Sequence, residues 1–241
     1  MHAELAGSIL VICLFVWRRN TMKKTKGIFL IFALSLMICL IACGKEKSPP
    51  IVPMDEAEIS AVEEAFYVML PLDGEMQINP RNCFLSSYYD SVDKLDLQAF
   101  LRYFPGSEQG TEQEFEALRN FKDWPFSQCA NLSDMPVPLH RYDAENVRAA
   151  LEEYGNISLE QTDYKEAPGV YYLEEFDAFY NYTSDFGLFP LRCVRGEKQG
   201  DRLYLYSEEY GEYPDKIMVR LTLEKRGNDY IIISRIPVED E

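Results

Sequence analysis

Residues 217–236 read IMVRLTLEKRGNDYIIISRI, and this stretch near the C-terminal end decides the fold class. Within residues 217–224 a branched apolar side chain occupies every odd position, which is the two-residue period of a strand with one buried face. Arg226-Gly227-Asn228-Asp229 supplies turn-forming residues, and residues 230–236 are again mostly apolar. The stretch therefore predicts an antiparallel β-hairpin.

Other strands are predicted upstream of this hairpin. Residues 191–195 and 202–207 flank the polar segment 197–201, which predicts a second hairpin. The tyrosine-rich stretch 170–182 predicts a strand, although Leu173, Phe176 and Tyr180 have a spacing that also suits a helix.

Helices are predicted in the first two thirds of the chain, where apolar residues recur three and four positions apart. Capping-box pairs begin two of them, Asp55 with Glu58 and Thr111 with Glu114. Asp143 begins a further helix, and Gly155 has the place of its left-handed C-terminal residue. The predicted helices cover 55–70, 97–104, 112–121 and 143–154, and a short strand is predicted at 83–89.

Helices followed by antiparallel strands predict an α+β fold, with N-terminal helices packed on a C-terminal antiparallel sheet. Residues 55–241 are expected to form a single globular domain. The closing hairpin, with Leu-Thr-Leu-Glu-Lys at 221–225 and Tyr-Ile-Ile-Ile-Ser at 230–234, resembles the last hairpins of NTF2-like cone folds. That resemblance covers the last third of the chain and implies a strongly bent sheet.

The N-terminal region has the pattern of a signal segment. Lys23, Lys24 and Lys26 follow Met22 and precede the apolar residues 28–42. Leu40-Ile41-Ala42-Cys43-Gly44 resembles the lipobox of bacterial lipoproteins of the signal peptidase II type. The resemblance implies a lipid on the thiol of Cys43, cleavage just before it, and a lipid anchor on the extracytoplasmic face of the cell membrane.

The length of the apolar run also favours export. Residues 28–42 fall short of the roughly 20 apolar residues that a membrane-spanning helix needs. The alternative is a short buried or spanning helix in which Cys43 is incidental. Residues 1–42 are thus interpreted as an upstream extension plus a signal segment with the true start at Met22, and 43–54 as a lipidated spacer. If Met1 is the start instead, the apolar run 9–17 and the signal segment could form a membrane hairpin.

Composition limits the partners. The chain has a formal net charge of −16, and it becomes more acidic without residues 1–42, which are mainly basic in their charge. Such a balance argues against nucleic acid as a partner. Beyond Cys43 the cysteines are Cys83, Cys129 and Cys193, an odd number that leaves the pairing open, with Cys83–Cys129 as one guess and three buried thiols as the alternative.

No cofactor or metal site is predicted. His140 is the only histidine after residue 42, so a site with several histidine ligands is excluded. Within Met135-Pro136-Val137-Pro138-Leu139-His140 it is interpreted as a surface or packing residue.

The segment 171–185 carries the candidate ligand-binding residues, which are Glu174, Asp177, Tyr180, Tyr182 and Asp185. On one strand, Glu174 would share an aromatic face with Tyr180 and Tyr182. Carboxylates beside aromatic rings suit sugars, peptides or cationic groups. The alternative places these aromatic residues in the core, with Glu174 in solvent or bonded to Arg192 or Arg195.

These residues predict a non-catalytic module of the cell envelope that binds a cell-wall component, a peptide or a protein partner. The alternative function is an envelope hydrolase that uses Glu174, Asp177 or Asp185 as its acid or base. Neither reading predicts a cofactor.

Overall fold

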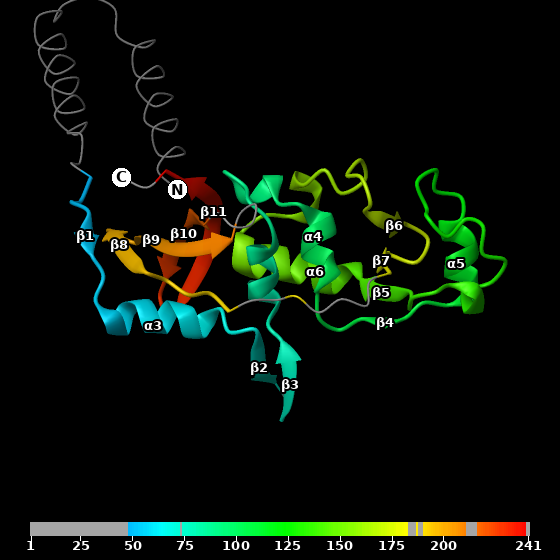
Figure 1. The fold of residues 1–241 in the computed structure, drawn as a ribbon, viewed down its shortest axis with the longest axis horizontal. Coiled ribbons are helices and arrows are strands. Elements are labelled where there is room, and N and C mark those ends of the chain that lie inside the picture. Colours follow the sequence, from blue (N-terminus) through cyan, green and yellow to red (C-terminus); the bar gives the residue numbers. More distant parts are fainter. Residues whose placement is uncertain (1–47, 73, 183–186, 188–189, 211–215, 240–241) are drawn as a thin grey trace, which may run out of the picture. The chain divides into compact units, whose positions relative to one another are not determined.

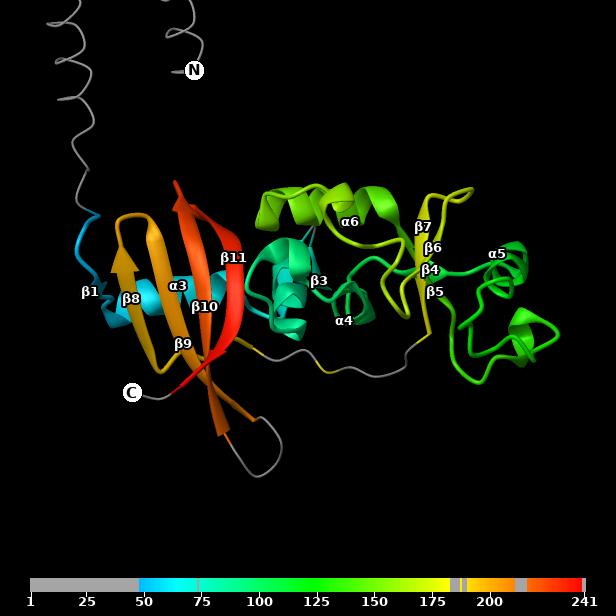
Figure 2. The same cartoon turned by 90° about the horizontal axis from the view of Figure 1, so that it is seen from above.

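The computed structural model describes residues 48–239 except 73, 183–186, 188–189 and 211–215. Residues Pro49–Glu241 form one compact unit, which is described here by itself. Figure 1 shows its helices and strands, and Figure 2 shows them from above. Cys43 and Met22 lie outside the described residues.

The larger sheet has five antiparallel strands in the order β1-β8-β9-β10-β11. The predicted hairpin 217–236 is confirmed, and its strands are longer than expected. A register shift between Thr222 and Leu223 marks a bulge, which increases local twist. The strands are β1 (Val52–Pro53), β8 (Arg195–Gln199), β9 (Arg202–Tyr210), β10 (Lys216–Arg226) and β11 (Asp229–Val238).

The second predicted hairpin is confirmed with a different first strand. Residues 195–199 form β8, where a polar loop was expected, and Gly200 takes the turn with φ of 61°. Leu203 and Leu205 of β9 face Leu223 and Leu221 of β10, so these four side chains lie on one buried face. Residues 195–199 form a strand despite their polar composition, because pairing and packing against β9 stabilise it.

Helix α3 (Glu56–Ala65) packs against this sheet, as both views show (Figures 1 and 2). The Asp55–Glu58 capping box is present. Glu58 forms an ion pair with Lys198 of β8, and the Glu63 carboxylate accepts a hydrogen bond from the amide of Cys193 at 2.7 Å. A Cβ on Gly196 would lie 2.9 Å from the sulfur of Met54 and 3.1 Å from Ile59, so the glycine lets the helix approach the strand.

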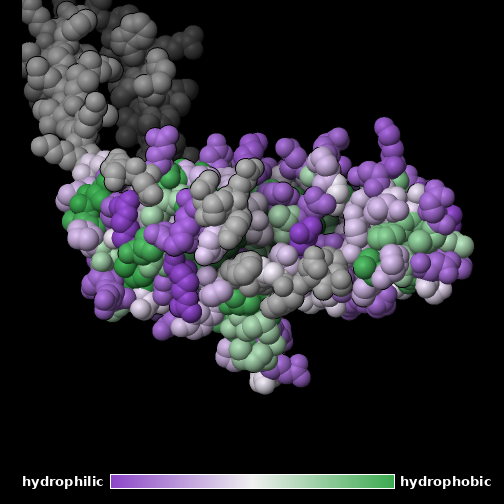
Figure 3. Space-filling view, viewed as in Figure 1, coloured by the Kyte–Doolittle hydropathy of each residue, from purple (hydrophilic) through white to green (hydrophobic). Residues whose placement is uncertain are grey.

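The prediction of a helix through residue 70 is wrong, because α3 ends at Ala65. The side-chain amide of buried Asn79 donates to the carbonyls of Ala65 and Tyr67, and these carbonyls would otherwise continue the helix. Strands β2 (Met69–Leu72) and β3 (Glu75–Ile78) then form a two-stranded hairpin. It projects from the body in Figure 3, with hydrophobic residues along it.

The predicted strand at 83–89 is also wrong. Residues Pro80–Ser86 form the 3-10 helix η1, which Asn79 caps and which starts with proline. Cys83 and Phe84 are fully buried on its inner side. Only Tyr89 makes a strand-like contact, an isolated bridge to Arg235.

The remaining helices largely follow the predictions but are shorter. Helix α4 (Leu97–Arg102) is capped by Asp96, and α5 (Glu112–Leu118) has the predicted Thr111–Glu114 capping box. The short helical turns are η2 (Val92–Lys94), η3 (Leu132–Asp134) and η5 (Leu159–Gln161).

Helix α6 (Ala144–Ala150) continues into the π-helical turn η4 (Leu151–Gly155). Its left-handed end is Asn156, with φ of 52°, and not Gly155 as predicted. A glycine at position 155 instead leaves room for close packing, since a Cβ there would lie 3.2 Å from Val92 and 3.4 Å from Phe84.

The smaller sheet has the order β4-β5-β7-β6. The prediction of one strand over 170–182 is wrong, because the chain turns between β6 and β7 and the two strands pair with each other. Asp177, with φ of 43°, ends this turn. The strands are β4 (Glu108–Gln109), β5 (His140–Asp143), β6 (Tyr171–Leu173) and β7 (Ala178–Asn181).

Two core clusters lie on opposite faces of this smaller sheet. Phe179 and Tyr142 belong to the first core cluster, together with residues of α3, η1, α4, α6 and the larger sheet. The second core cluster consists of Phe115, Leu118, Trp124, Leu139, Tyr171, Leu173, Ala178 and Tyr180. The fold is a mixed α+β arrangement in which the short strands β2 to β5 lie between the helices, and among the described residues only strands follow η5.

Candidate functional site

The predicted ligand-binding residues do not share one strand face. Glu174 is exposed in the turn between β6 and β7. Asp177 receives two hydrogen bonds from the guanidinium of Arg148, at 2.7 and 2.9 Å, and one from the hydroxyl of Tyr172 at 2.8 Å. The Arg148 hydrogen bonds, with help from Tyr172, lower the pKa of Asp177 to about 2. Asp177 thus fastens helix α6 to the β6–β7 turn.

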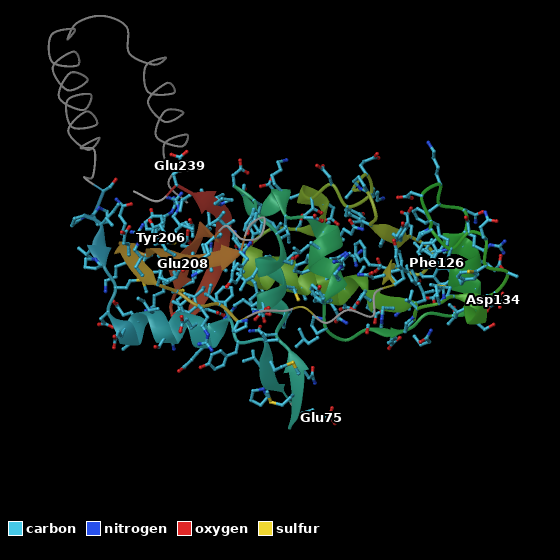
Figure 4. All side chains as sticks on the ribbon, viewed as in Figure 1. Glu75, Phe126, Asp134, Tyr206, Glu208 and Glu239 are labelled. Atoms are coloured by element: carbon cyan, nitrogen blue, oxygen red, sulfur yellow. The ribbon has the colours of Figure 1, made fainter. Side chains whose placement is uncertain are left out.

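Tyr180 and Tyr182 belong to the second core cluster or pack against it, as the core alternative for these aromatic residues predicts. Tyr180 is 2% exposed, and the Tyr182 ring packs against Trp124 and Phe126 with centroids 5.5 and 4.9 Å apart. Figure 4 labels Phe126 beside α5. Asp185 lies outside the described residues.

The Tyr180 hydroxyl donates to a buried carboxylate, that of Glu114, at 2.7 Å. Glu114 also accepts from the amide of Thr111 at 2.7 Å, from the Thr111 hydroxyl at 2.8 Å and from Nε of Arg141 at 2.9 Å. Burial raises the pKa of Glu114, but these hydrogen bonds outweigh burial and lower it. The sequence predicts its capping-box bonds and misses Tyr180 and Arg141.

A cavity of about 520 Å³ lies between η1, α4 and the larger sheet. Leu85 of η1, Ala99 of α4 and the neighbouring Tyr103 line one part of it, and Leu191 lines another. The ends of β9 and β11 contribute the rest, including Glu208, which Figure 4 labels on the sheet. Its volume falls in the range of small-molecule sites, roughly 300–1,000 Å³.

The polar groups of the cavity differ in how they are paired. Arg235 forms an ion pair with Glu209, donates to the carbonyl of Ser87 at 3.0 Å and lies 4.6 Å from the centre of the Tyr88 ring. Glu208 pairs with Lys216. Both carboxylates of the lining are therefore neutralised by a nearby cation.

Arg102 and Arg192 also line the cavity. Among the ion pairs formed between described residues, neither guanidinium has a carboxylate partner. The lining thus holds three arginines and two glutamates, and the cation excess lies on Arg102 and Arg192. The described lining therefore carries more positive than negative side chains, in a chain whose net charge is −16.

Sequence reasoning missed this cavity. Arg102, Arg192 and Arg235 come from segments far apart in the chain, and none belongs to a local motif. They line one cavity because the tertiary fold brings together α4, β11 and the segment before β8.

The cysteines and the histidine do not form a site. Cys83, Cys129 and Cys193 are all free thiols, so the guessed Cys83–Cys129 bond is absent. Cys83 lies in the first core cluster and Cys129 packs against the second. His140 is half-buried in β5, opposite Gln109 and Asn181. Among the described residues, no three metal-ligating side chains gather.

Comparisons with family models, with curated proteins and with solved structures find no match to this chain. In the part of the chain that the structure describes, no helix combines the length and the apolar character needed to cross a membrane.

Proposed function

We propose that the protein is a lipoprotein, anchored through Cys43 to the outer side of the cell membrane, whose folded body is a non-catalytic binding module. The proposed location rests on the lipobox-like residues Leu40–Gly44 and on the segment before them, which is first basic and then apolar. Two acyl chains would give stable anchoring, which a single chain does not.

The proposed location can be tested by intact-mass measurement of the full-length chain expressed in a bacterium and extracted from membranes with detergent. We expect the mass of residues 43–241 plus a diacylglyceryl group. Cys43→Ser should abolish both cleavage and lipid. Cys39→Ser is the matched control, because Cys39 lies in the same apolar run, and it should leave the mass of the mature protein unchanged. An unlipidated chain beginning at Met1 or Met22 would contradict the proposal.

The cavity beside Leu85 and Leu191 carries the binding proposal. Its lining combines an apolar part, formed by Leu85, Ala99 and Leu191, with a larger number of polar and charged side chains. A ligand from the cell envelope would bury its apolar part against these two leucines. Peptides and cell-wall fragments are ligands that a protein at the proposed location would meet.

The hydrolase alternative has less support among the described residues. Glu174 is exposed, and Asp177 is held by Arg148. A general acid or base needs a reactive position beside a bound substrate. Neither carboxylate lines the cavity.

For the finer fold, we propose that the five-stranded sheet with α3 is of the NTF2-like cone type. Support comes from the long β10–β11 hairpin and from its bulge, since bulges bend strands. An experimental structure with a flat sheet beside α3 would contradict this proposal.

Ligand binding can be tested with a neutral naphthalene dye whose fluorescence rises in apolar surroundings. We expect saturable binding at one site. Ala99→Phe places a ring in the cavity and should weaken binding about tenfold or more, because the added ring takes the dye's volume. Ala57→Phe, on the exposed side of α3, is the matched control and should bind as the parent does. Equal affinity of the parent and Ala99→Phe would contradict a ligand in this cavity.

A further inference from the structure

Arg102 and Arg192 are the two charged residues of the cavity lining that have no ion pair among the described residues. Most other arginines of the described chain are paired, for instance Arg141 with Glu114 and Arg148 with Asp177. Arg102 and Arg192 are exposed residues of the lining, so an anion can reach them from solvent.

We propose that the ligand of this cavity is a small amphipathic oxyanion, whose carboxylate or phosphate end is held by Arg102 and Arg192. This inference rests on the proposed binding function and names its ligand class. A guanidinium presents a planar fork of N–H donors that matches both kinds of anion. The apolar part of the ligand then lies against Leu85 and Leu191.

The third arginine of the lining does not take part in anion recognition. Arg235 is 6% exposed and already has Glu209, the Ser87 carbonyl and the Tyr88 ring as partners. Its role is to fix the sheet-side wall. Glu208 and Glu209 do not make the cavity a cation site, because Lys216 and Arg235 already pair with them.

The test is a set of four eight-carbon compounds, octanoate, octyl phosphate, octanol and octylamine, each used to displace the neutral dye at pH 7.5. We expect the two anions to bind about tenfold or more tightly than octanol, and octylamine to bind less tightly than octanol. The preference for anions should shrink in 1 M salt, which screens charges. The ratio of octanoate to octyl phosphate distinguishes the two sources of the anion.

Two variants test whether Arg102 and Arg192 cause the preference for anions. Arg102→Gln with Arg192→Gln should lower the affinity for octanoate to that for octanol and leave octanol binding unchanged. Arg119→Gln, which removes a cation paired with Glu116 on α5, is the matched control and should keep the preference.

The outcomes separate the two proposals. Equal binding of octanoate and octanol, or a preference for octylamine, would overturn the anion inference and leave the binding function standing. An anion preference that survives in the double variant would also overturn it. Absence of saturable dye binding in the parent protein would overturn the binding function itself.

Discussion

Replacing Glu114 by alanine is expected to lower the free energy of unfolding by about 3 to 4 kcal/mol. The carboxylate is 3% exposed and accepts hydrogen bonds from Thr111, Tyr180 and Arg141. Its removal leaves the Tyr180 hydroxyl and the Arg141 guanidinium without their buried acceptor. The loss is a large share of the roughly 5–15 kcal/mol by which a domain is stable.

Urea unfolding at pH 7 measures this loss. Glu116→Ala is the matched control, because Glu116 lies on the same helix, is exposed and forms an ion pair with Arg119 three residues away. We expect Glu116→Ala to lower the free energy of unfolding by about 0.5 kcal/mol or less. Glu114→Gln keeps the size of the side chain and loses the charge. It should fold, with a free energy of unfolding between those of Glu114→Ala and Glu116→Ala. Equal stability of Glu114→Ala and Glu116→Ala would show that the buried network contributes little.

The same carboxylate gives a pH dependence with a definite sign. Its pKa is lowered in the folded protein, so the folded state favours the ionised form. The stabilisation is therefore complete above the pKa of an unfolded glutamate, about 4.3, and is lost as the pH falls through the lower folded pKa. The stability difference between the parent and Glu114→Gln should accordingly shrink on acidification below about pH 4.

Glu114 also shows how far the sequence predicts this structure. Its position three residues after Thr111 predicts the helix start and the local bonds, because capping is a short-range pattern. Its bonds to Tyr180 and Arg141 join residues far apart in the chain. No local pattern specifies which distant donor meets a buried carboxylate.

Helix starts were predictable where a capping residue marks them, and strands where apolar residues alternate, whereas the helix ends were not. In β10 the odd positions 219, 221 and 223 are buried and most even positions are less so, although Thr222 is buried as well. In contrast, β6 and β7 are buried on both faces, so residues 171–173 and 178–180 are apolar without alternation. The turn between them is marked only by Asp177 in a left-handed conformation, and the sequence gives no glycine there.

The candidate site was less predictable than the fold. The aromatic and acidic residues around 171–185 are conspicuous in the sequence, but Asp177 and Tyr180 have structural partners. The cavity arginines are single residues in unremarkable surroundings. Arg102 ends α4 and Arg192 precedes β8, and only the tertiary fold brings both into one cavity lining.

Replacing Phe100 by alanine is expected to cost about 3 to 5 kcal/mol of unfolding free energy. Phe100 is fully buried in the first core cluster, with its ring 5.1 Å from Phe84 and 5.2 Å from Phe104 between centroids. The substitution removes this aromatic packing and leaves a cavity that rigid neighbours fill only in part. Met76→Ala is the control, because Met76 is 60% exposed and should cost about 0.5 kcal/mol or less.

Urea unfolding of Phe100→Ala measures this loss and also tests whether the two core clusters unfold together. After residue 42 the only tryptophan is Trp124, which lies in the second core cluster, whereas Phe100 lies in the first. We expect Phe100→Ala to shift the urea midpoint of Trp124 fluorescence as much as that of far-UV circular dichroism. A shift in circular dichroism alone would mean that the clusters unfold separately, and an unchanged midpoint in both would contradict the assigned packing of Phe100.

The smaller sheet is the physical reason to expect one transition. Along β7, Phe179 faces the first core cluster, and its neighbours Ala178 and Tyr180 face the second. Losing either cluster would expose one apolar face of the same four short strands to water, which destabilises the sheet in proportion to the apolar area exposed. A cavity at Phe100 therefore weakens the sheet that also holds Trp124, although no contact joins the two side chains directly.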